Sequence, residues 1–240
     1  MKKPIMILGI LASQPVAAQT VDLFELPEGC TAYLTIQTQD CSVDHMFTCE
    51  GDADGTQRRA SIGENGLSYI GQIDDETQWV ESLHIFSGHA ERLSDEVRDR
   101  ASISELVEAG IDTYDFTTES DEIGVTRYVG QDSLTGEQVT IDGVTLDETQ
   151  FNIIAYDEDG EVIWSAEGNE YISQRFRMFL SGTSTVTTPD GSFDSEDNPV
   201  EFIFEGEPGF LSANPKHGCG ATLSSAPSLL ERLEALNNAL

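Results

Sequence analysis

Short apolar and β-branched segments recur along this chain at intervals of strand length, and residues that favour turns separate them. In the run from 171 to 180, Phe176 and Met178 are apolar. Arg175 and Arg177 alternate with them and are charged. An alternation with a period of two predicts strands that have one buried and one solvated face.

Thirteen such segments are predicted to be strands, at 31–39, 45–50, 57–62, 67–73, 78–86, 89–93, 123–129, 137–141, 151–156, 161–166, 171–180, 183–188 and 200–204. Short turns of hairpin type join many of them, among them 63–66, which contains Asn-Gly, and 157–160, which ends in Asp-Gly. The fold class is therefore all-β and mainly antiparallel. We expect a strongly curved meander sheet, either a half-barrel or a barrel, because a flat sheet of this width exposes its edges.

Two segments have a helical pattern instead. Residues 102–110 begin with a Ser-x-x-Glu capping box and end in glycine, which predicts one short helix inserted into the meander. Near the end of the chain, small residues at 220–227 form a tether. Leucines then recur at helical spacing up to Leu240, and they predict an amphipathic C-terminal helix within 221–240.

The first eighteen residues are typical of a cleaved signal peptide. Lys2 and Lys3 precede a short apolar run, and small residues at 16–18 provide a cleavage site. The apolar run is shorter than the roughly 20 residues that a membrane-spanning helix needs. We therefore expect an exported chain, periplasmic or secreted, with a single β-rich domain at 19–220 and no stable membrane anchor.

Four cysteines follow the predicted cleavage site, and an even number in an exported chain predicts two disulfides. Four cysteines allow three pairings. We favour Cys41 with Cys49, closing a short loop, and Cys30 with Cys219, joining the start of the domain to its end. No Cys-x-x-Cys spacing is present, which disfavours a zinc site built from these residues.

The chain is strongly acidic, with 44 Asp and Glu against 12 Lys and Arg and a formal charge of −32. The predicted leader has two lysines and no acid, so the remaining chain carries −34. This field repels nucleic acid and anionic membrane, and we expect neither as a partner.

Candidate catalytic or metal-binding chemistry is sparse. The turns at 52–55 and 157–160 resemble incomplete calcium loops, but Asp-Gly turns explain them more simply. His84 and His89 flank a turn and could meet each other, with Glu91 or Glu81 as an oxygen ligand; ordinary surface histidines are the simpler interpretation. Ser87 has no identifiable partners for a catalytic triad. We predict no catalytic residue, no cofactor and no metal.

Residues with the strongest ligand-binding potential are aromatic or arginine residues within predicted strands. Aromatic side chains could line a cavity on a concave face, although core packing also explains them. The scarce arginines could converge on a carboxylate or phosphate, although cross-strand ion pairs explain them too. The candidate ligand-binding residues are Trp79, Arg127, Trp164, Arg175, Phe176, Arg177 and Met178.

These features favour an exported, non-catalytic binding protein whose curved sheet holds an apolar small molecule or a lipid. An alternative is an envelope interaction protein that binds a protein partner through a sheet edge or through the C-terminal helix. A hydrolase is the third hypothesis. No run of residues carries the signature of a particular family, and the oligomeric state is not predicted.

Overall fold

The computed structural model describes residues 23–95 and 97–220 of this chain. Within these residues it contains one helix, α1 (Ile103–Ala109), and thirteen strands. The strands are β1 (Cys30–Thr38), β2 (Ser42–Cys49), β3 (Gln57–Gly63), β4 (Gly66–Ile73), β5 (Trp79–His84), β6 (His89–Leu93), β7 (Ile111–Ser120), β8 (Gly124–Ile141), β9 (Val144–Tyr156), β10 (Val162–Ser173), β11 (Met178–Thr188), β12 (Gly191–Glu196) and β13 (Pro199–Ile203).

All thirteen strands belong to one antiparallel sheet, and the first twelve follow one another in sequence order. The last strand, β13, pairs with β1, so β12 and β13 are the two edges of an open sheet. Only residues 197 and 198 separate these two strands along the chain. The Asp197 amide donates to the Gly182 carbonyl on β11, and the Asn198 carbonyl accepts from Gln39 beyond β1. The two edges are thus held close together.

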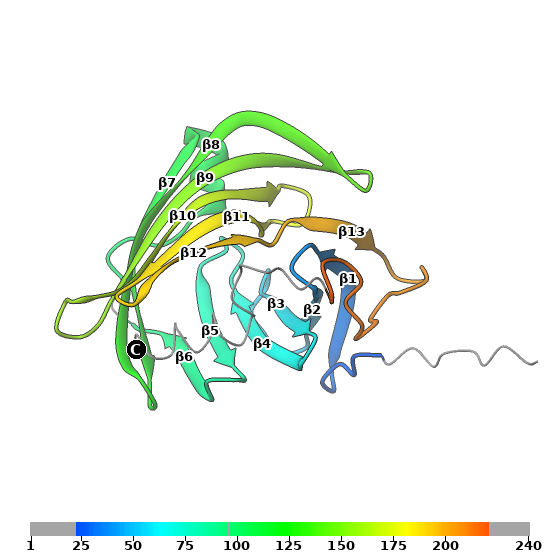
Figure 1. The fold of residues 1–240 in the computed structure, drawn as a ribbon, viewed down its shortest axis with the longest axis horizontal. Coiled ribbons are helices and arrows are strands. Elements are labelled where there is room, and N and C mark those ends of the chain that lie inside the picture. The colour runs from blue at the N-terminus through cyan, green and yellow to red at the C-terminus, as the bar shows by residue number, and fades with distance from the viewer. Residues whose placement is uncertain (1–22, 96, 221–240) are drawn as a thin grey trace, which may run out of the picture.

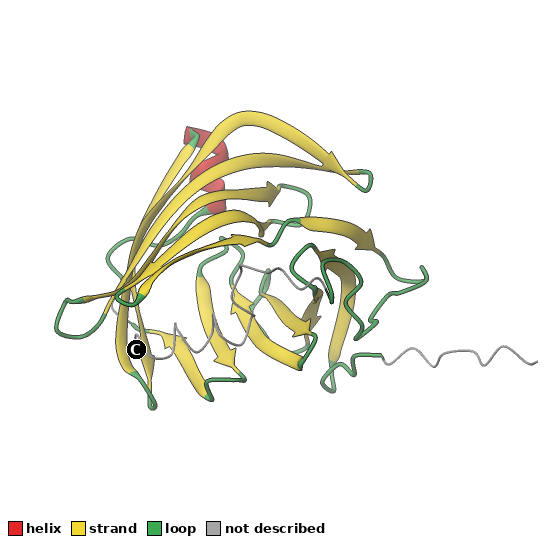
Figure 2. Cartoon of the chain, in the orientation of Figure 1, coloured by secondary structure: helices red, strands yellow, loops and turns green. Residues whose placement is uncertain are grey.

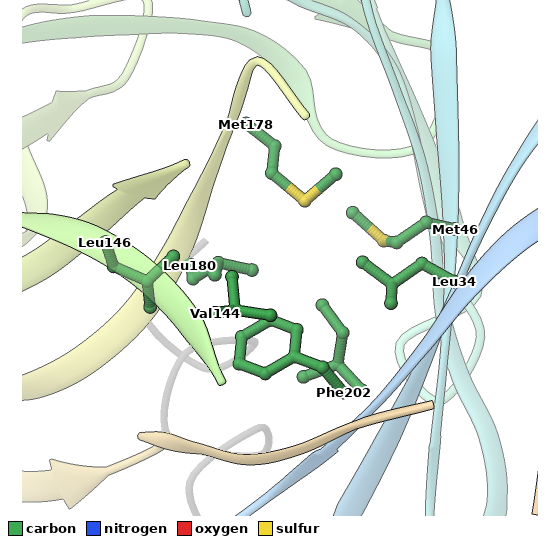
Figure 3. Packing of buried hydrophobic residues seen from close by; sticks show 8 residues of the cluster. Leu34, Met46, Val144, Leu146, Met178, Leu180 and Phe202 are labelled. Carbon is green, nitrogen blue, oxygen red and sulfur yellow. The ribbon is translucent and has the colours of Figure 1, made fainter. Parts of the chain in front are cut away.

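The sheet is strongly curved, and its long strands β7 to β11 arch over the shorter strands β1 to β6 (Figure 1). Side chains from opposite parts of the sheet meet on the enclosed face. Leu34 and Met46, from the first two strands, point toward Leu146 and Met178, from β9 and β11 (Figure 3). The complete group, which we call the filled cluster, is Leu34, Ile36, Met46, Val144, Leu146, Met178, Leu180 and Phe202.

Side chains from outside the sheet also cover the opposite face of β1 to β3. Successive strand residues point to opposite faces, so Phe47 lies on the other side of the sheet from its neighbour Met46. Phe47 packs with Ala60, and residues Phe24 and Phe210 from outside the strands lie against them. This part of the sheet is therefore buried on both faces.

The inserted helix is confirmed where the capping pattern predicts it. The Ser102 hydroxyl accepts a hydrogen bond from the Glu105 amide, and Gly110 ends the helix with a φ of 79°. Ile103 and Leu106 are buried against Ile172 of β10. The helix therefore packs on the sheet through its apolar side (Figure 2).

Some predicted strand boundaries are wrong. The run at 171–180 is not one strand: β10 ends at Ser173 and β11 begins at Met178, with a turn between them in which Arg177 has a φ of 49°. The segments at 123–129 and 137–141 belong to a single 18-residue strand, β8, interrupted by a register shift between Leu134 and Gln138. Strands β7 (111–120) and β12 (191–196) are missing from the prediction.

The predicted disulfide pairing is also wrong. The structure joins Cys30 to Cys49 and Cys41 to Cys219. Cys30 and Cys49 face each other across the β1–β2 pair, with Cα atoms 4.0 Å apart. Cys41 directly precedes β2, and Cys49 is its last residue. At about 3.3 Å per residue, the strand separates these two cysteines by more than roughly 20 Å.

The two disulfides indicate an oxidising compartment outside the cytoplasm. The predicted signal peptide (1–18), most of the tether and the predicted C-terminal helix (221–240) lie outside the described residues. Among the described residues, no helix combines the length and apolar character needed to cross a membrane.

Candidate functional site

A cavity of about 280 Å³ lies on the enclosed face, beside the filled cluster. Met46 and Met178 belong to both, so they form the boundary between the filled and the hollow parts. The lining is mostly apolar and comes from strands on both sides of the curved sheet. The other apolar lining residues are Tyr69, Gly71, Ile73, Trp79, Ala101, Tyr114, Phe116, Phe151, Ile153, Trp164, Ala166 and Phe179.

Interlocked aromatic rings build one wall of the cavity. The Trp79 ring stands edge-on to Phe116 and Tyr128, with centroids 5.6 and 5.3 Å apart. Tyr128 also packs against Trp164, at 6.0 Å. Edge-on and tilted contacts at these distances are favourable for aromatic pairs. The rings therefore support one another from the side and leave their remaining surface toward the cavity.

Glycine makes room for this wall at Gly130 of β8. A Cβ atom at this position would overlap the ring of Tyr114 and the Asn152 carbonyl. The Tyr114 ring can lie across the strand only because no side chain is present there.

Four side chains that can carry a charge, Arg58, Arg59, Asp132 and Glu170, also line the cavity. The Arg59 guanidinium carbon lies 5.1 Å from the centre of the Tyr69 ring, a cation–π contact. Burial, together with the nearby charges of Glu170 and Asp112, raises the pKa of Asp132 to about 8. Burial also raises the pKa of Glu170 to about 7, although Arg59 opposes this shift. Near neutral pH, both carboxyl groups therefore exist largely or partly in the protonated, uncharged form.

A second group of polar side chains lies next to the cavity. His84 and His89 are cross-strand partners at the β5–β6 turn, and their rings are stacked with centroids 4.4 Å apart. The Nε2 atom of each histidine lies 3.5 Å from the same oxygen, Oε1 of Glu91. The other oxygen, Oε2, accepts hydrogen bonds from the Thr118 and Tyr128 hydroxyls. We call His84, His89 and Glu91 the histidine–glutamate cluster.

The carboxylate of this cluster is buried but ionised. Burial alone would raise the pKa of Glu91, yet the contacts with His84 and His89 and the hydrogen bonds from Thr118 and Tyr128 together outweigh it. The pKa of Glu91 therefore lies well below its usual value.

Two aromatic residues connect the cluster to the cavity. Tyr69 lines the cavity and stands edge-on to His84, at 5.2 Å. Tyr128 donates to Glu91 and packs against Trp79 and Trp164 of the cavity wall.

The structure brings together only part of the predicted ligand-binding set. Trp79, Trp164 and Met178 line the cavity. Arg175, Phe176 and Arg177 line a separate and more open hollow beside the turn at 52–55. These three residues lie in the β10–β11 turn and not in a strand, and they are not part of the cavity lining.

The arginines have partners elsewhere and do not converge. Arg127 forms a two-pronged ion pair with Asp115, with both contacts at 2.7 Å. The Arg175 guanidinium carbon lies 4.7 Å from the Phe176 ring. Arg177 donates to the Asp75 carbonyl and pairs with Glu76 at 2.9 Å. The simpler interpretation, pairing with surplus acids, therefore holds for Arg127 and Arg177.

The other motifs also have structural roles. Asp52 pairs with Arg58 through both of its oxygens, and Asp157 Oδ1 accepts the amides of Asp159 and Glu161 within its own turn. Ser87 makes no hydrogen bond to either histidine in the described part of the chain. The expectation of ordinary surface histidines is wrong for His89, which is only 4% exposed.

Several residues of the site were missing from the prediction. Arg59 lies in a predicted strand, but its partners come from distant parts of the chain. Asp132 and Glu170 are two of 44 acidic residues, and nothing in the local sequence distinguishes them from the others. Their burial depends on how β8 and β10 curve, which no local pattern determines.

Comparison with models of protein families, with curated proteins and with solved structures finds no match to this chain.

Proposed function

We propose that this protein is an exported, non-catalytic binding protein that holds a compact apolar small molecule in the cavity of its curved sheet. The observation that carries the proposal is the cavity on the concave side of the sheet, which is lined by two tryptophans and by other aromatic and aliphatic side chains. Small-molecule sites are typically concave, mainly apolar and equipped with a few polar groups that orient the ligand. The cavity has each of these properties.

The size of the cavity narrows the class of ligand. Its 280 Å³ is near the lower end of the roughly 300 to 1,000 Å³ typical of small-molecule sites. A ligand with a fused ring system or one short alkyl chain suits this volume, whereas a lipid with two long chains exceeds it. We therefore narrow the expected ligand from lipids in general to a compact molecule.

The polar groups of the cavity narrow the class of ligand further. A protonated carboxyl group donates one hydrogen bond and accepts others, so Asp132 and Glu170 suit an uncharged oxygen or nitrogen on the ligand. Arg59 adds hydrogen-bond donors to the same lining. The best ligand is thus an apolar molecule with one or two neutral polar groups.

The architecture supports the same function. A half-barrel formed by one meander sheet encloses a ligand between facing strands and keeps it away from water. The two disulfides suit an exported chain, periplasmic or secreted.

The proposal can be tested by titrating the non-reduced protein with 1-aminoanthracene, a compact aromatic probe whose fluorescence increases in apolar surroundings. We expect saturable binding of one probe per chain, with quenching of tryptophan fluorescence by energy transfer from Trp79 and Trp164. The Ala166→Leu variant extends a side chain into the cavity and should abolish binding.

A matched control is Glu167→Leu, which adds the same side chain at the exposed neighbouring position on the opposite face of β10. This control should bind the probe as the wild type does. Equal binding by Ala166→Leu and the wild type would place the probe outside the cavity and contradict the proposal.

A further inference from the structure

The histidine–glutamate cluster contains three metal-ligating side chains whose donor atoms converge. Each of the three residues offers a ligand atom, and these atoms lie within 4.8 Å of one another. His89 and Glu91 are buried, and His84 is half-buried, with 30% of its side chain exposed. Two imidazoles and one carboxylate are donors that zinc and several other divalent transition metals bind in proteins.

The distances within the cluster are long for hydrogen bonds. N–H···O bonds are usually about 2.9 to 3.0 Å between heavy atoms, whereas both Nε2–Oε1 distances here are 3.5 Å. A cluster optimised for hydrogen bonding would draw at least one histidine closer to the buried carboxylate. The observed spacing leaves room for an ion between the three atoms.

Metal coordination accounts for this spacing. Zinc bonds of about 2.0 to 2.1 Å at tetrahedral angles place neighbouring ligand atoms roughly 3.3 Å apart. An octahedral ion with similar bonds would require about 3.0 Å. The 3.5 Å spacing is closer to the tetrahedral value.

We propose that Nε2 of His84, Nε2 of His89 and Oε1 of Glu91 bind one divalent transition-metal ion, and that zinc is the ion the cluster fits best. With three protein ligands, a tetrahedral ion keeps one position for water or another small ligand. The site lies beside the cavity, where Tyr69 contacts His84 and Tyr128 donates to Glu91. Metal binding at this site does not depend on a ligand in the cavity.

The surroundings support the ligands. Thr118 and Tyr128 hold Oε2 of Glu91, which orients Oε1 toward the histidines. Partners that orient ligands in this way are a regular part of metal sites. The lone pair of each Nε2 lies in the plane of its ring, and the two rings are nearly parallel. Both nitrogens can therefore bind one ion only if the rings tilt toward each other. His84 has room to tilt because its side chain is partly exposed.

The charge around the cluster also favours a cation. Glu122 lies close enough for its charge to interact with His89, and its carboxylate accepts a hydrogen bond from the Ala90 amide. The whole chain has a formal charge of −32, which attracts divalent cations over a long range.

A second group of possible ligands does not share these features. Cys41, Cys219 and Glu64 also lie close together, but the two sulfur atoms form a disulfide. They are therefore not thiolates and do not bind metal as thiolates do.

The direct test combines two measurements on the non-reduced protein. Isothermal titration calorimetry of the chelator-treated protein with Zn²⁺ gives the affinity and the number of sites. X-ray absorption of the zinc-loaded wild type identifies the atoms that coordinate the ion. We expect one tight site per chain, with two imidazole nitrogens in the zinc coordination shell. His84→Gln and His89→Gln should each reduce the affinity by more than 100-fold. Thr118→Val removes only a support of Glu91 and should reduce it by roughly 10- to 100-fold.

His217→Gln is the matched control, because His217 contacts a single carboxylate, Glu201, at 2.9 Å. This variant should bind zinc like the wild type. Weak binding of several ions that all four variants retain would indicate adsorption to the acidic surface and overturn the proposal. A coordination shell of oxygen atoms alone would overturn it without any variant, so the test does not depend on variants that fold.

Discussion

The filled cluster and the cavity share one face of one sheet, yet side chains occupy them differently. In the filled cluster, Leu34, Leu146 and Phe202 come from opposite parts of the sheet and interlock, each at most 3% exposed. In the cavity, Trp79 and Trp164 pack sideways against their neighbours along the wall. Flexible aliphatic side chains reach across the enclosed space, whereas rigid rings that support each other on one wall leave space in front of them.

The difference extends to charge and covalent bonds. The filled part contains no ionisable group among its eight residues, whereas Arg59, Asp132 and Glu170 line the cavity. Both disulfides are attached to β1, β2 and the turn between them. The comparison suggests that one part of the enclosed face provides stability and the other provides a place for a ligand.

Removal of the disulfides should have the largest effect. A chain-entropy estimate gives a loss of about 5 kcal/mol in the free energy of unfolding for Cys41→Ala with Cys219→Ala, which open a loop of 178 residues. The pair Cys30→Ala and Cys49→Ala, with a separation of 19, should lose about 3 kcal/mol. Urea unfolding measures both losses. Peptide mapping without reduction checks the pairing, and a Cys41–Cys49 peptide would show that the pairing is wrong.

Truncation of aliphatic side chains should distinguish the two parts. Leu146→Ala in the filled cluster should reduce the free energy of unfolding by about 3 to 5 kcal/mol. Ile153→Ala in the cavity wall should cost only about 2 kcal/mol, because the Ile153 side chain lacks packing partners on its cavity side. Thermal and urea unfolding of both variants tests this. Equal losses would mean that the cavity wall is packed as tightly as the cluster.

Enlargement of alanines provides the converse test. Ala155 is completely buried, so Ala155→Leu should overpack its surroundings and cost about 1 to 3 kcal/mol. Ala166 borders the cavity, and Ala166→Leu should change stability by less than about 1 kcal/mol because space is available. Unfolding curves for the two variants give the comparison. A large loss from Ala166→Leu would show that the cavity cannot accept a leucine side chain.

The ionisable groups of the cavity predict a smaller, pH-dependent effect. Burial raises the pKa of Asp132 from 3.8, its value in an unfolded chain, to about 8 in the folded protein. As the pH rises, the unfolded chain therefore releases this proton first. Its stabilising contribution is complete below about pH 4 and is lost progressively up to about pH 8. Asp132→Asn should flatten this decline and raise stability at pH 8 by on the order of 1 to 2 kcal/mol.

Unfolding measured at intervals from pH 4 to pH 8 tests the prediction. Asp194→Asn is a suitable control, because Asp194 lies on the edge strand β12. Parallel pH profiles for Asp132→Asn and the wild type would mean that Asp132 is not buried in the cavity.

Local patterns were sufficient for the fold class and for the inserted helix. The period of two in the strands and the Ser102 to Gly110 capping pattern depend on neighbours in sequence, so the sequence alone reveals them. The boundary at 174–177 could not be found in this way, because an alternating pattern also continues through a tight turn. The disulfide pairing depends on the register of β1 and β2, and one residue of register decides which cysteines face each other.

The candidate site was only partly predictable for a related reason. Trp79 and Trp164 were recognisable because large aromatic residues in strands usually have a packing role. His84 and His89 could be placed near each other from a single turn. Glu91 was also a candidate from the sequence, because it lies two residues from His89 in the same strand. The position of Asp132 at the cavity depends on the curvature of the whole sheet. That curvature results from contacts between distant strands, which a single sequence does not reveal.

The most direct test of the account is native mass spectrometry of the non-reduced protein purified from the cells that produce it. We predict one bound compact organic molecule per chain, which extraction with an organic solvent removes. The same preparation of Ala166→Leu should carry none. A wild-type chain that has only its own mass, with two disulfides and no removable molecule, would contradict the claim that the cavity is a ligand-binding site.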